Sequence, residues 1–131
     1  MEELMIAIPL IGTVSAGKPG DWLPTDGLRF VRPLKNAIHM RGVIAMRVNG
    51  DSMMGDGIMD GDFAIIQTVD IAPPEKIVVV RTPHGLTVKR VIRQRDTVVL
   101  KSSNPVFKDQ AWPVEDVCLI GVLRRIERDY L

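Results

Sequence analysis

The chain has 131 residues, of which 46% are hydrophobic and 25% are charged, and its formal net charge is +1. This length and balance are typical of a single globular domain with a substantial core. They exclude a strongly basic nucleic-acid-binding surface, so we expect no direct DNA binding by this chain. The single cysteine, Cys118, excludes an internal disulfide, and we interpret it as a small buried side chain.

The first sixteen residues are an apolar segment that ends near the small pair Ala16–Gly17. Val14 and Ala16 resemble a signal-peptide cleavage site, but the segment begins with two glutamates where a signal peptide is basic. No run in the chain approaches the roughly 20 apolar residues that a membrane span requires. We therefore expect a cytoplasmic protein without membrane attachment. By itself the small pair is compatible with a turn or with a bond that is cut.

Short β-like runs follow a connector over residues 17–41 that is rich in Gly and Pro. The runs are rich in Val and Ile and are bounded by turn residues, which is typical of strands. His84–Gly85 predicts a hairpin, and residues 103–105 predict a turn. The predicted strands are residues 42–48, 63–68, 76–81, 86–93, 97–101 and 117–125.

No long stretch shows a helical period, and no helix-turn-helix pattern or glycine-rich phosphate loop is visible. The predicted fold is therefore mostly β, a small folded-sheet or barrel-like domain. We expect residues 1–16 to form a mobile N-terminal arm and residues 17–131 to form the domain itself.

Residues 48–62, VNGDSMMGDGIMDGD, place a serine directly after a predicted strand. Gly50 and Asp51 precede Ser52 in a glycine-containing turn, which predicts an exposed serine beside backbone N–H groups. Such N–H groups can stabilise a tetrahedral oxyanion. The four aspartates of the segment lack the alternate spacing of a calcium loop, and turns or caps explain them better. We therefore predict no metal site and no cofactor.

A nucleophilic Ser52 would need a general base, and three side chains are candidates. His39 lies in the connector and His84 in a turn, so each is more typical of a solvated side chain. Lys89 interrupts an apolar strand. Alternation would turn it to solvent beside Thr87, whereas burial would lower its pKa from about 10.4 and allow it to act as a base. Taken alone, this pattern favours the reading in which Lys89 faces solvent.

Three motifs, GDSM at 50–53, GIMDGD at 57–62 and TVKR at 87–90, together resemble those of the LexA-type self-cleaving peptidases. The resemblance covers residues 8–124 and implies a fold similar to that of signal peptidases. It implies Ser52 as the nucleophile, Lys89 as the base, and the N–H groups of Asp51 and Ser52 as oxyanion donors. The element GTVSAG then implies that the chain cuts its own Ala16–Gly17 bond.

The same resemblance implies partners. It predicts a homodimer formed through the apolar run 117–123, and cleavage stimulated by a RecA–single-stranded-DNA filament in the SOS response to DNA damage. One alternative is a UmuD-like accessory subunit of a translesion polymerase that acts mainly by protein binding. Another is a secreted β domain with a signal at residues 1–16. Because no DNA-binding domain precedes the small pair, we expect a stand-alone protein or a piece of a repressor.

Overall fold

The computed structural model describes residues 5–15, 27–35 and 42–130. These residues form nine strands and two short 3-10 helices: β1 Ile6–Ser15, β2 Leu28–Val31, β3 Val43–Asn49, η1 Met54–Asp56, β4 Phe63–Thr68, β5 Ile77–Thr82, β6 Gly85–Gln94, β7 Thr97–Lys101, β8 Gln110–Pro113, η2 Val114–Asp116 and β9 Cys118–Glu127. No helix within the described ranges is long and apolar enough to cross a bilayer.

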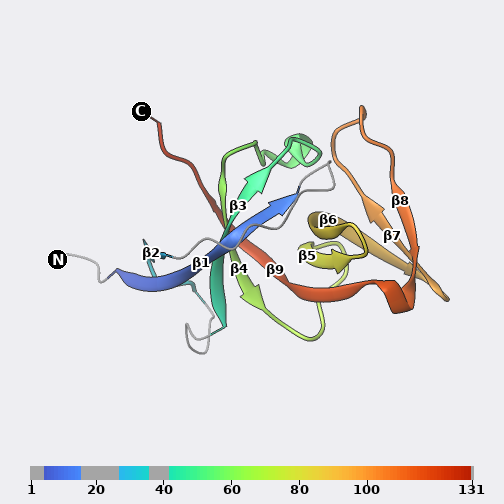
Figure 1. Cartoon of the computed structure of the whole chain (residues 1–131), viewed down its shortest axis with the longest axis horizontal. Coiled ribbons are helices and arrows are strands. Elements are labelled where there is room, and N and C mark those ends of the chain that lie inside the picture. The colour runs from blue at the N-terminus through green and yellow to red at the C-terminus, as the bar shows by residue number, and fades with distance from the viewer. Residues whose placement is uncertain (1–4, 16–26, 36–41, 131) are drawn as a thin grey trace.

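The strands form one sheet in the order β2-β1-β3-β4-β9-β5-β6-β7-β8. Figure 1 shows β1 running beside β3, with β7 and β8 at the opposite end of the sheet from β2. β1 pairs parallel to β3, and its last residue, Ser15, also pairs with Thr87 of β6. The sheet therefore curls until β1 meets β6. A mostly β, folded-sheet domain, as the sequence predicts, is confirmed.

The strands predicted from the sequence are β3, β4, β5, β6, β7 and β9, each displaced by no more than two residues at either end. Thr82 pairs with Gly85, so the predicted hairpin is confirmed. Cys118 is exposed at the start of β9, and the expectation of a buried thiol is wrong. It begins a strand whose first position faces outward.

Three strands, β1, β2 and β8, are absent from the sequence-based prediction. β1 lies in the segment interpreted as an arm, yet Ile8 is only 1% exposed and belongs to a core cluster with Val31 and Val43. Pro9 breaks the strand pattern in the sequence, and β1 is stabilised by β2 and β3, which are distant in the chain. Pairing between strands that are distant in the chain gives no local signal in the sequence.

A second core cluster lies beneath the segment that carries Ser52. It joins Met46 and Val48 of β3 and Val88 of β6 to Met53 and Ile58, which follow the serine. Met53 and Ile58 are almost fully buried, at 0% and 1% exposure. These two apolar side chains anchor an otherwise polar, glycine-rich segment to the sheet.

Candidate active site

Ser52 lies in a tight turn directly after β3. The turn begins at Gly50, whose φ of 103° is in the left-handed region that favours glycine. The Gly50 N–H donates to Oδ1 of Asp60 at 2.7 Å, and the Met54 N–H donates to the Asp51 carbonyl at 3.1 Å. Ser52 itself is 0% exposed, which corrects the expectation of an exposed serine.

Lys89 projects from β6 toward this turn. Its Nζ lies 2.5 Å from Oγ of Ser52 and 3.2 Å from the Val88 carbonyl. The side chain is 3% exposed, so the reading in which alternation turns Lys89 to solvent is wrong. At this point β6 is covered on both faces, since Val88 is also fully buried. The structure thus joins two polar side chains that are 37 positions apart in the sequence.

Burial changes the acid–base chemistry of Lys89. Removal of its ammonium group from water lowers the pKa of Lys89 from 10.5 to about 8. At pH 7 about one molecule in ten then holds a neutral Lys89, against fewer than about one in a thousand for an ordinary lysine. A neutral amine beside a serine hydroxyl can accept its proton.

A distant loop packs onto the serine turn and adds two residues that the sequence analysis did not select. The Ser103 N–H donates to the Ser52 carbonyl at 2.9 Å, and Nδ2 of Asn104 donates to the Asp51 carbonyl at 3.1 Å. A Cβ on Gly55 would lie 2.1 Å from the Ser103 carbonyl oxygen, so this close approach requires glycine. From the sequence, residues 103–105 were predicted only to form a turn.

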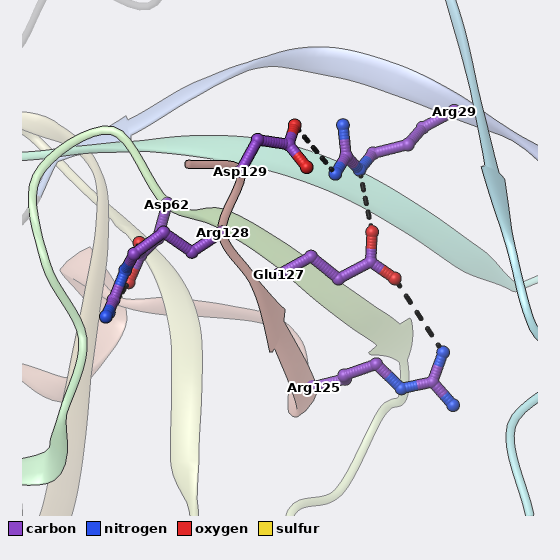
Figure 2. Close-up of polar contacts among 6 residues, drawn as sticks. All are labelled: Arg29, Asp62, Arg125, Glu127, Arg128 and Asp129. Carbon is purple, nitrogen blue, oxygen red and sulfur yellow. Dashed lines mark hydrogen bonds and ion pairs between the residues drawn. The ribbon is translucent and has the colours of Figure 1, made fainter. Parts of the chain in front are cut away.

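The aspartates of the segment stabilise turns and form ion pairs. Besides the Asp60 contact with Gly50, Asp56 pairs with Arg90 at 2.7 Å. Asp62 is fully buried and accepts hydrogen bonds from Arg128 at 2.6 and 2.7 Å (Figure 2). Burial alone would raise the pKa of Asp62, but hydrogen bonds from Arg128 and the Met59 N–H outweigh burial and lower it. Within the described ranges, no three His, Cys, Asp or Glu side chains gather as metal ligands do.

The remaining candidates lie elsewhere. His84 is exposed in its hairpin turn and stacks edge-on against Trp112 at 4.8 Å. His39, Ala16 and Gly17 lie outside the described residues. The described part of β1 ends at Ser15, whose backbone pairs with Asn49 of β3 and Thr87 of β6. Ser15, the residue before Ala16, therefore lies between β3, which precedes Ser52, and β6, which carries Lys89.

Comparison with known proteins identifies a family and several relatives of this chain. Residues 9–124 match the family described as Peptidase S24-like. The chain is 34% identical to a LexA repressor of Clostridium perfringens over 98% of its own length and 63% of that protein. It is 37% identical to a LexA repressor of Syntrophotalea carbinolica, over 93% of this chain and 62% of that protein. It thus spans about three fifths of the length of these relatives. The chain belongs to the Peptidase S24-like family.

Proposed function

We propose that this chain is a serine peptidase that cuts its own Ala16–Gly17 bond, with Ser52 as nucleophile and Lys89 as general base. The observation that carries the proposal is the 2.5 Å contact between Nζ of Lys89 and Oγ of Ser52 at a site where both residues are buried. Burial keeps a useful fraction of Lys89 neutral, and a neutral lysine can deprotonate a serine.

The reaction proceeds by acyl transfer. Neutral Lys89 takes the proton of Ser52, and Oγ attacks the carbonyl carbon of Ala16. The N–H groups of Asp51 and Ser52 donate to the oxyanion that forms. The Lys89 ammonium then returns the proton to the Gly17 nitrogen as the peptide bond breaks. Water hydrolyses the resulting ester and releases residues 1–16.

The course of β1 supports Ala16–Gly17 as the bond. The backbone of Ser15 pairs with Asn49, which lies three residues before Ser52. It also pairs with Thr87, which lies two residues before Lys89 in β6. A substrate delivered by a strand of the same sheet needs no bimolecular encounter, which can supply a large effective concentration. Small residues at the bond let the backbone approach a buried serine closely.

The decisive experiment is incubation of the purified chain at pH 9, followed by intact-mass analysis. We expect release of residues 1–16, and we expect Ser52→Ala and Lys89→Ala to remain intact. Loss of the same residues from either variant would contradict the proposal. Production of Ser52→Ala in cells tests the alternative of a secreted β domain, because a signal peptidase would still remove the segment.

We further propose that cleavage is a switch in a cytoplasmic DNA-damage response, stimulated by a RecA–single-stranded-DNA filament. The names of the relatives support this placement, since they are LexA repressors. Adding the filament at pH 7 should accelerate cleavage of the wild-type chain and leave Ser52→Ala intact. The alternative, an accessory subunit of a translesion polymerase, predicts that the cleaved chain retains such a polymerase in a pull-down.

A homodimer remains a proposal as well. β9 pairs with β4 on one edge and β5 on the other, so the run 117–123 belongs to a central strand. Its apolar side chains Leu119, Ile120, Val122 and Leu123 are nevertheless only partly covered by the chain itself. Sedimentation velocity should report a species of twice the 14.6 kDa chain mass, and a monomer at micromolar concentration would contradict the dimer.

A further inference from the structure

The loop between β7 and β8 holds two successive carbonyls of the serine turn. The Ser103 N–H reaches the Ser52 carbonyl, and the Asn104 carboxamide reaches the Asp51 carbonyl across 53 positions of sequence. Both contacts are to the backbone on either side of Ser52 rather than to a side chain. They therefore act on the direction of the peptide groups in this turn.

The Asp51 carbonyl and the Ser52 N–H belong to one planar trans peptide, so they point in opposite directions. The Asp51 oxygen accepts two hydrogen bonds, from the Met54 N–H and from Nδ2 of Asn104, which uses both of its lone pairs. The plane of this peptide is therefore held from one side. The Ser52 N–H points away from the loop, and it donates to no acceptor among the described residues.

The Asn104 side chain is itself held in place. It is 7% exposed, and its Oδ1 accepts the Val106 N–H at 3.1 Å. Its main-chain carbonyl accepts the Phe107 N–H at 3.0 Å. The Val106 contact determines the orientation of the carboxamide, because a flipped amide would set oxygen against the Asp51 carbonyl and nitrogen against an N–H. Nδ2 is thus preorganised to donate to Asp51.

We propose that Asn104 is a positioning residue for the cleavage reaction: through the Asp51–Ser52 peptide it aims the Ser52 N–H at the oxyanion and holds Ser52 against Lys89. The inference rests on the proposed function. Asn104 contacts neither the substrate bond nor the reacting atoms. Its contribution is to remove the rotational freedom of one peptide group before the reaction begins.

The test uses two variants whose side effects differ. Asn104→Asp has nearly the same shape and keeps an acceptor for the Val106 N–H, but it loses the donor to Asp51. Asn104→Ala loses both contacts and introduces no charge near Lys89. We expect the plateau rate of self-cleavage at alkaline pH to fall by about 10- to 100-fold in both variants, less than loss of a whole oxyanion donor. In Asn104→Ala the midpoint of the pH profile should stay where the wild-type chain has it.

A second readout measures the reactivity of Ser52 without requiring cleavage of residues 1–16. Labelling of Ser52 by a small fluorophosphonate needs the dyad and the oxyanion donors but not the docked segment, and it should slow in parallel with cleavage. Ser102→Ala is the matched control, because it removes from the same loop a hydroxyl whose Oγ makes no hydrogen bond among the described residues. It should change both rates by less than about twofold, since it leaves both hydrogen bonds from the loop to the serine turn in place.

The rates are compared at a temperature well below the melting temperature of every variant. Plateau rates equal to wild type in Asn104→Asp and Asn104→Ala would overturn the inference, as would a loss that Ser102→Ala shares. A shifted midpoint with an unchanged plateau would also overturn it, because Asn104 would then act on the pKa of Lys89. If the wild-type chain neither cleaves nor labels, the proposed function fails and this inference fails with it.

Discussion

At the scale of single residues, the chemistry depends on how Lys89 is buried. In the proposed mechanism neutral Lys89 is the reactive form, and its population rises as the pH passes through its pKa of about 8. The same burial destabilises the folded chain, because the charged form of Lys89 is removed from water.

We predict that self-cleavage rises between pH 7 and pH 9 with a midpoint near 8 and is flat above pH 9. The reason is that the fraction of neutral Lys89 follows its lowered pKa. First-order rate constants from a stopped time course at each pH give the profile. A midpoint near the ordinary lysine value of about 10.4 would mean that Lys89 is solvated during the reaction.

We predict that Lys89→Met abolishes cleavage and stabilises the fold at pH 7 by about 2 kcal/mol. Lowering the lysine pKa from 10.5 to about 8 corresponds to about 3 kcal/mol, from which about 1 kcal/mol is lost with the hydrogen bond to Ser52. Between pH 8 and 10.5 the unfolded chain binds a proton that the folded chain lacks, so wild-type stability rises with pH in this window.

The gain from Lys89→Met should therefore shrink as the pH rises and vanish at about pH 10, where the remaining cost of burying the lysine equals the contribution of the lost hydrogen bond. Urea unfolding at pH 7 and pH 10 measures both values. Ser52→Ala is the control, because it removes the same hydrogen bond and leaves the buried amine in place. Equal stability gains at the two pH values would show that packing, and not the charge of Lys89, accounts for the effect.

At the scale of elements, β2 ties the N-terminal strand to the end of β9. Arg29 of β2 donates to Glu127 at 2.8 Å and lies 3.6 Å from Asp129, and Figure 2 shows the guanidinium between the two carboxylates. The same guanidinium lies 3.8 Å above the ring of Phe63. Because β2 pairs with β1, these contacts stabilise the docked position of the strand that precedes the small pair.

We predict that Arg29→Gln slows self-cleavage about two- to fivefold in low salt, since partly buried ion pairs and cation–π contacts contribute of order 1 kcal/mol. The wild-type rate should fall with added salt, and the rate of Arg29→Gln should respond less. Fluorophosphonate labelling of Ser52 should be unchanged, because the dyad is intact. Lys101→Gln, on the exposed face of β7, is the charge-matched control, and an equal effect there would contradict the prediction.

At the scale of the whole molecule, one sheet holds both the strand that leads to the proposed cleavage site and the proposed Ser52–Lys89 dyad. β1 pairs with both β3 and β6; the serine turn directly follows β3, and Lys89 lies in the middle of β6. We predict that cleavage occurs within one chain, so its rate constant should not change over a hundredfold range of protein concentration. Wild-type chain mixed with tagged Ser52→Ala chain should leave the tagged chain intact. Cutting of the tagged chain at the wild-type rate would show an intermolecular reaction.

The sequence by itself determined the fold class and most of the strands, because Val- and Ile-rich runs and their turn residues are local signals. It also determined Ser52 and Lys89 as the candidate nucleophile and base, since the motifs that contain them are specific when taken together. It gave the wrong exposure for both residues: it predicted an exposed serine, and alternation along the strand favoured a solvent-facing Lys89, whereas both are buried. Alternation along β6 describes one sheet face, and here both faces are covered.

Only the tertiary structure decided the contacts between distant segments. The pairing of β1 with β3 and β6, and the contact of Asn104 with Asp51, depend on which segments the curled sheet brings together. The ion pair between buried Asp62 and partly exposed Arg128 joins residues 66 positions apart. Such contacts leave no local trace, because a polar side chain in a turn has the same sequence signal whether it faces water or a backbone carbonyl. The lowered pKa of Lys89 has the same origin, since burial is a property of the assembled sheet.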